Sequence, residues 1–180
     1  MTLRPFDELR VAPSTVEGRQ AQGHPERSRG VTIVAALAVG WVAVLLLAPW
    51  LAVPAASAVY LFGAHICHQI AERSWHLGGA QLPVCARCLG IYVGAAVALM
   101  PGPWRVQSRA PRDPAYVRRV AILAVALNAA TMAIEWAGLA QMSNAVRTGA
   151  GAALGIAVAL AIRQALHAPA LRAGTLEPVQ

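Results

Sequence analysis

All three cysteines of the chain fall in one short stretch, as Cys67-His68 followed by Cys85-Ala86-Arg87-Cys88. A Cys-x-x-Cys pair lets two thiolates reach one metal ion, and an upstream Cys-His pair can complete a tetrahedral site of the kind that zinc accepts. The spacing therefore predicts a zinc-like ion that is held by Cys67, His68, Cys85 and Cys88.

Other uses of these residues stay open. His65 or His76 could replace His68, and His65, His68 and Glu72 form an i, i+3, i+7 stripe that would suit a His₂-carboxylate site. The Cys85-x-x-Cys88 pair at a helix N-terminus would instead favour dithiol–disulfide exchange, or could close a structural disulfide. The cysteines could also pack helices as small apolar side chains.

Few residues beyond the first thirty could carry acid–base chemistry. The 15 basic residues are all arginine, the acids number 8, and the formal net charge is +7. Without lysine, Schiff-base and P-loop chemistry are excluded. A metal ion with an open position could activate water or polarise a lipid ester or phosphate. Glu135 or Glu72 would then be the general base and an arginine such as Arg147 would bind the anion.

The composition is that of an integral membrane protein, because 57% of the residues are hydrophobic, only 13% are charged, and the mean hydropathy is +0.52. We predict an all-α membrane helix bundle with four spans and one short interfacial or re-entrant helix, and five full spans as the alternative. The expected spans are residues 31–48, 83–100, 120–139 and 144–166, with the short helix at 55–73 and Pro83 at the first helical position of its span.

Charge and apolar patterning also divide the chain and orient it. Residues 1–30 are expected to be a disordered tail, 31–166 the bundle with a Cys/His motif segment at 65–92, and 167–180 a flexible tail. The arginine-rich loop 101–119 predicts that this loop and both termini are cytoplasmic in the cell membrane. The lipid bilayer is the expected partner. No nucleic-acid module is expected, because the arginines fit membrane topology better.

Up-down alternation of the spans should bring polar residues to one membrane face. Three helical stripes at i, i+3, i+7 are candidates: Cys85, Cys88 and Tyr92; Asn128, Thr131 and Glu135; Asn144, Arg147 and Gly151. Because an ionisable group at membrane depth is costly unless it is paired, we expect Glu135 to pair with Arg147. The alternative is that both are ordinary interfacial charges. Two GxxxG repeats, Gly90-xxx-Gly94 and Gly151-xxx-Gly155, permit close helix contact but arise often by chance in an alanine-rich chain.

The residues from about Cys67 to Gly155 resemble the DUF2085 family, which consists of small, uncharacterised multi-pass membrane proteins of bacteria and archaea. The resemblance is carried by these residues: Cys67-His68-Gln69, Glu72-Arg73-Ser74, Pro83-Val84-Cys85-Ala86-Arg87-Cys88, Gly90-Ile91-Tyr92, Gly94, Glu135, Asn144 and Arg147-Thr148-Gly149. Glu135-Trp136 departs from the Asp-Gly of the family pattern. The resemblance implies a shared site, with no particular activity, that is made of Cys67, His68, Glu72, Arg73, Cys85, Arg87, Cys88 and Tyr92.

These observations together predict a multi-pass membrane protein with a Cys/His-rich metal site at one membrane face, surrounded by Arg73, Arg87, Tyr92 and Asn144. A membrane dithiol/disulfide redox protein that uses Cys85 and Cys88 is one alternative. A non-enzymatic transporter or scaffold is another. The sequence leaves open the substrate, the identity of the metal, whether the protein is an enzyme, and its oligomeric state.

Overall fold

The computed structural model describes residues 25–100 and 113–167. Its helices are α2 (Pro25–Leu47), α3 (Val53–Ile66), α4 (Ala86–Leu99), α5 (Pro114–Trp136) and α6 (Asn144–His167). Two 3₁₀ turns, η1 (Ala48–Trp50) and η2 (Ala71–Arg73), and two strands, β1 (Ser74–Leu77) and β2 (Ala80–Cys85), complete the described part. Most of the expected N-terminal and C-terminal tails and most of loop 101–119 lie outside the described residues.

The predicted helical membrane bundle is confirmed. Three described helices are long and apolar enough to cross a membrane, namely Arg29–Trp50, Pro114–Trp136 and Asn144–Leu166. The shorter apolar helices are α3 and α4, each of 14 residues. At 1.5 Å per residue such a helix is only about 21 Å long, whereas the hydrocarbon core of a bilayer is about 30 Å thick.

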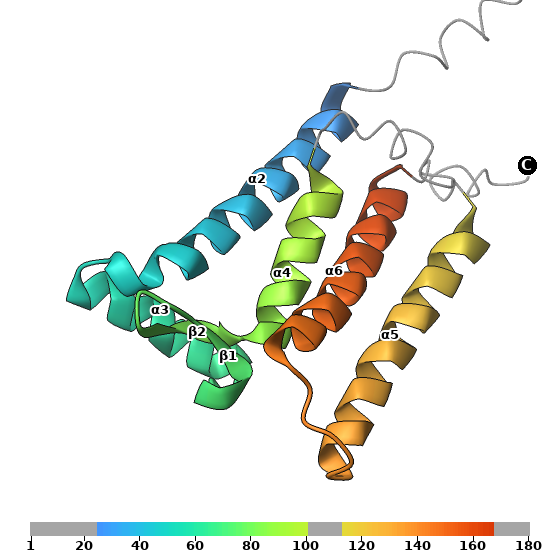
Figure 1. Ribbon diagram of the computed structural model, residues 1–180. Coiled ribbons are helices and arrows are strands. Elements are labelled where there is room, and N and C mark those ends of the chain that lie inside the picture. The colour runs from blue at the N-terminus through green and yellow to red at the C-terminus, as the bar shows by residue number, and fades with distance from the viewer. Residues whose placement is uncertain (1–24, 101–112, 168–180) are drawn as a thin grey trace, which may run out of the picture.

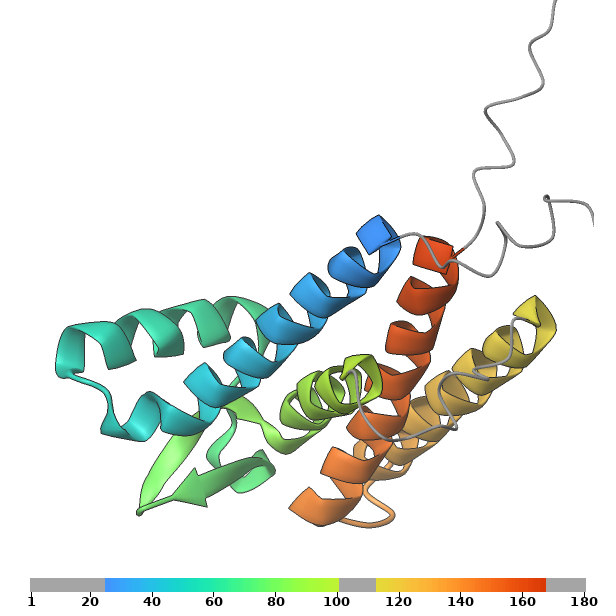
Figure 2. The ribbon, with the colours of Figure 1, turned by 90° about the horizontal axis from the view of Figure 1, so that it is seen from above.

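The four helices α2, α4, α6 and α5 lie side by side in that order (Figure 1). The start of α2, the end of α4, the start of α5 and the end of α6 lie at one end of the bundle. The hairpin of β1 and β2 lies at the other end, next to α3, which folds back from the end of α2 (Figures 1 and 2). The starts of α4 and α6 and the end of α5 therefore meet beside this hairpin.

The starts of α2 and α5 differ from the sequence prediction for a local reason. Helix α2 begins at Pro25, inside the expected tail 1–30. Helix α5 begins at Pro114, so Arg118 and Arg119 of the expected loop are helical. Proline is preferred at the first helical position, and Asp113 caps this helix by accepting a hydrogen bond from the Ala115 N–H at 2.8 Å.

Glycines bring the backbones of α4 and α6 into direct contact. A Cβ atom at Gly90 would collide with the Thr148 carbonyl oxygen, and one at Gly155 would collide with the Ile91 carbonyl oxygen. A Cβ atom at Gly94 or Gly151 would likewise collide with a carbonyl oxygen of the other helix. The two GxxxG repeats that could have arisen by chance therefore form the helix interface.

The β-hairpin is the element that the sequence prediction missed. Its strands pair antiparallel, with Ser74 opposite Cys85 and Leu77 opposite Ala80. Gly78 and Gly79 form the turn with φ values of +59° and +82°, as a tight Gly-Gly hairpin turn requires. The hairpin occupies the connection expected between the short helix 55–73 and the span 83–100, together with the first three residues of that span.

Pro83 and Cys67 explain this difference in backbone terms. Pro83 lies in β2 and not at the start of a helix. The ladder of β1 and β2 is irregular at this point, so the missing N–H of Pro83 is tolerated. Helix α3 ends at Ile66, because Cys67 has an extended backbone with φ −149° and Gln69 has φ +49°. His65, His68 and Glu72 therefore do not lie on one helix, and the stripe expected from their spacing is wrong.

Candidate functional site

The three cysteines converge between the end of α3 and the start of α4. Cys67 follows α3, Cys85 is the N-cap of α4, and Cys88 lies in its first turn. Their sulfur atoms all lie within 4.8 Å of one another, and the Cys85 N–H donates a hydrogen bond to the Cys67 sulfur at 3.1 Å. Tetrahedral zinc with Zn–S bonds of about 2.3 Å needs sulfur atoms about 3.8 Å apart. The thiol cluster of Cys67, Cys85 and Cys88 fits such an ion.

The thiol cluster lies against an apolar core. Leu45, Leu82, Val84 and Leu89 are buried there, and Tyr92 and Trp41 pack against them. The Trp41 ring makes edge-to-face contacts with Tyr92 and Phe62, at centroid distances of 6.2 and 5.2 Å. Tyr92 thus belongs to the same face of α4 as the cysteines, as the sequence stripe predicted.

The surroundings of Cys67 favour its thiolate. Hydrogen bonds from the Cys85 and Cys88 thiols lower the pKa of Cys67, and they outweigh the burial that raises it. The cluster also lies at the N-terminus of α4, where the partial positive charge of the helix stabilises an anion. The thiolate is the form of cysteine that binds metals and attacks disulfides.

No histidine joins this cluster in the part of the chain that the structure describes, so the expected Cys₃His ligand set is reduced to three cysteines. His68 is exposed, because successive side chains of an extended segment point to opposite sides and Cys67 points inward. His65 is exposed and its Nδ1 lies 2.7 Å from the Leu61 carbonyl oxygen, while His76 is exposed on the hairpin.

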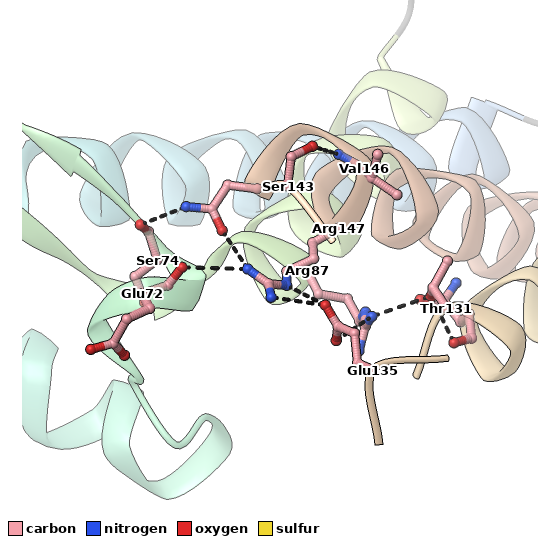
Figure 3. A network of polar contacts seen from close by, with 10 residues as sticks. Glu72, Ser74, Arg87, Thr131, Glu135, Ser143, Val146 and Arg147 are labelled. Carbon is pink, nitrogen blue, oxygen red and sulfur yellow. Dashed lines mark hydrogen bonds and ion pairs between the residues drawn. The ribbon is translucent and has the colours of Figure 1, made fainter. Parts of the chain in front are cut away.

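A buried charge network lies at the same end of the bundle. The Arg147 Nε and Nη2 atoms each lie 2.8 Å from Oε1 of Glu135, and Arg87 Nη2 lies 3.5 Å from its Oε2 (Figure 3). The side chains of Glu135 and Arg147 are only 2% and 6% exposed, and that of Arg87 is 17% exposed. The predicted pair is confirmed, and Arg87 is a second partner of Glu135.

Further hydrogen bonds join this network to four elements. Arg87 donates to Thr131 on α5, and Arg147 donates to Asn144 Oδ1 at 2.9 Å and to the Glu72 carbonyl oxygen at 3.4 Å. The Asn144 amide in turn donates to the carbonyl oxygen of Ser74 at 3.0 Å. The network therefore fixes the hairpin, α4 and α5 around the start of α6.

Each charge of the network lies at the helix end that disfavours it. Arg87 and Arg147 lie in the first turns of α4 and α6, where the helix dipole is positive, and Glu135 lies in the last turn of α5, where it is negative. Pairing offsets this conflict, but two arginines against one glutamate leave one positive charge in excess. Such local conflicts are typical of functional sites.

The structure separates the thiol cluster from the charge network, although we expected one shared site. Arg87 lies between Cys85 and Cys88 in sequence, and adjacent residues on a helix point about 100° apart. Arg87 therefore reaches α5 while the cysteines face α2 and α3. Within residues 25–100 and 113–167, no side-chain hydrogen bond or ion pair joins a cysteine to Arg87, Glu135 or Arg147. The Glu72 carboxylate is exposed and points away from the network (Figure 3).

Gln69 is a site residue to which the sequence assigned no role. Its Nε2 donates to the Tyr60 carbonyl oxygen at 2.8 Å and to the Pro83 carbonyl oxygen at 2.7 Å. Its own carbonyl oxygen accepts a hydrogen bond from Gln81 at 2.6 Å. Gln69 therefore ties α3 to β2 and holds Cys67 beside Cys85. The sequence feature that could have indicated this role is the place of Gln69 in the Cys67-His68-Gln69 motif.

Comparisons with known proteins agree with a membrane location. A family model described as a predicted membrane protein (DUF2085) matches residues 67–161. An uncharacterised protein of Methanocaldococcus jannaschii is 41% identical over 46 residues, which are 26% of this chain and 30% of that protein. An uncharacterised protein of Methanothermobacter thermautotrophicus is 52% identical over 31 residues, which are 17% of this chain and 28% of that protein. No solved structure matches the chain.

Proposed function

This chain belongs to the DUF2085 family of predicted membrane proteins, and we propose that it binds one zinc-like ion through Cys67, Cys85 and Cys88. The observation that carries the proposal is the convergence of three free thiols within 4.8 Å from two separate segments. The place of Cys85 and Cys88 at the N-terminus of α4 supports it, because the helix dipole stabilises thiolates, which are the metal-binding form.

The surroundings of the thiol cluster support a structural role for this ion. Three thiolates make an ion electron-rich, and the apolar core of Leu45, Leu82 and Val84 restricts access to it. The ion would tie the end of α3 to the start of α4. The catalytic roles expected for Glu72, Glu135 and Arg147 stay predictions. Of the two glutamates, Glu72 suits a general base better, because both carboxylate oxygens of Glu135 are engaged in ion pairs.

Metal analysis of the purified full-length protein tests the proposal. We expect about one zinc per chain, and we expect Cys88→Ser to lose it because two thiolates do not complete the site. His68→Ala is the matched control, since His68 is exposed and lies outside the thiol cluster. A wild-type protein without metal, or a Cys88→Ser variant that keeps it, would refute metal binding at this place. Loss of the metal in His68→Ala would instead show that His68 is a ligand, as the Cys₃His set predicted from the sequence requires.

A second candidate function is dithiol–disulfide exchange. It is favoured by the position of Cys85 and Cys88 at the N-terminus of α4, the usual placement of a reactive Cys-x-x-Cys pair. Alkylation before and after treatment with dithiothreitol separates the two functions. A metal-free protein with one reactive thiol before reduction and three after it would support the redox function.

A further inference from the structure

A cleft opens beside the charge network. Its volume is about 460 Å³, and it is lined by Ile70, Glu72, Arg73, Gln141, Met142 and Arg147. These residues come from the segment before the hairpin, from the connection between α5 and α6, and from the first turn of α6. The cleft therefore lies at the end of the bundle where α5 ends and α6 begins (Figure 1).

The charge balance around this cleft is positive. The adjoining network holds two arginines and one glutamate, and the Arg147 side chain is only 6% exposed. Arg73 is half-buried, and its guanidinium makes no hydrogen bond or ion pair with any described residue. The Glu72 carboxylate points away from Arg147 (Figure 3) and forms no ion pair in the described ranges. An excess positive charge beside the buried guanidinium of Arg147 is costly unless an anion compensates it.

We propose that this cleft binds a phosphate group between Arg73 and Arg147. The planar guanidinium fork of Arg73 matches phosphate oxygens, while Arg147 is held in place by Glu135 and Asn144 and adds its positive charge at the rim. The N-terminus of α6, a helix of 24 residues, adds partial positive charge at the same place. The phosphate belongs either to a soluble molecule or to a lipid headgroup, because the cleft lies at the end of a membrane bundle.

Calorimetric titration of the full-length protein in detergent with inorganic phosphate tests the soluble source. We expect saturable binding of one phosphate per chain that Arg73→Gln weakens at least tenfold. Gln141→Glu, which adds a negative charge to the cleft, should weaken it as well. Arg118→Gln is the matched control, because Arg118 is exposed and lies at the opposite end of the bundle. Chelation of metals with EDTA should leave the affinity unchanged.

Native mass spectrometry tests the lipid source, with the protein released from micelles that contain phosphatidic acid. Retention of one phosphatidic acid that falls in Arg73→Gln but not in Arg118→Gln assigns the cleft to a lipid phosphate. Arg73-dependent binding in either experiment supports the proposal. Equal behaviour of Arg73→Gln and Arg118→Gln in both experiments overturns it, as does phosphate binding that EDTA abolishes, since the phosphate would then lie on a metal. That last result would leave the metal proposal intact.

Discussion

At the scale of single residues, the Glu135–Arg147 pair makes the strongest prediction for stability. Both side chains are almost fully buried, so removing one partner leaves an uncompensated charge at a cost of about 3 to 5 kcal/mol. Glu135→Gln and Arg147→Gln should each lower the thermal midpoint in detergent markedly. Asp113→Asn is the control, because asparagine also caps a helix. If the double variant loses as much as the two single variants together, the side chains do not interact.

Arg87 should matter less than Arg147 for the same carboxylate. It lies farther from Glu135, at 3.5 Å against 2.8 Å, and its side chain is more exposed. When Arg87 is removed, the Glu135 carboxylate also keeps its closer partner Arg147, so no uncompensated charge is left. We expect Arg87→Gln to lower the thermal midpoint by clearly less than Arg147→Gln in the same detergent. An equal or larger loss for Arg87→Gln would show that Arg87 is the main partner.

At the scale of elements, the α4–α6 interface predicts opposite effects for neighbouring glycines. Gly151→Ala should destabilise the protein by about 1 to 3 kcal/mol, because the new Cβ collides with the Arg87 carbonyl oxygen and forces the helices apart. Gly149→Ala, on the same helix, meets nothing within 4 Å and should be neutral or stabilising by up to about 1 kcal/mol. Thermal unfolding of both variants checks this, and similar midpoints would argue against the close packing.

The hairpin makes a separate prediction at this scale. Gln69→Gly keeps the positive φ of the backbone but leaves the carbonyl oxygens of Tyr60 and Pro83 without their donor. The hairpin should then open more often, and Cys67, now only 8% exposed, should react faster with maleimide. Gln164→Ala on α6 is the control. An unchanged alkylation rate of Cys67 would mean that Gln69 does not hold the hairpin.

At the scale of the whole molecule, the orientation in the membrane follows from the arginines. His76 lies on the hairpin and Arg118 near the start of α5, at opposite ends of the bundle, and both are exposed. The positive-inside rule predicts that the Arg118 end is cytoplasmic. In a background in which serine replaces the native cysteines, His76→Cys should be labelled in intact cells and Arg118→Cys only after permeabilisation. The reverse pattern would invert the orientation.

The features of the molecule that could be predicted from the sequence are those that follow from a regular spacing of apolar or polar residues. The apolar runs predicted the long helices. The polar stripe of Asn128, Thr131 and Glu135 predicted that Glu135 is the ion-pair partner of Arg147. The hairpin was not predictable, because Pro83 suits the first turn of a helix as well as an irregular strand. The exposure of His68 was not predictable either, because it depends on the extended backbone at Cys67, which no local pattern in the sequence reveals.

The glycine contacts also fix the position of α4 relative to α6 along the bundle axis. If one helix slid by a single residue along the other, a side chain would replace a glycine hydrogen against a carbonyl oxygen. The pair therefore has one permitted register. Since Cys85 and Cys88 begin α4 and Arg147 begins α6, the separation between thiol cluster and cleft along the bundle axis is set by main-chain contact, and side-chain rearrangement at either place leaves it unchanged.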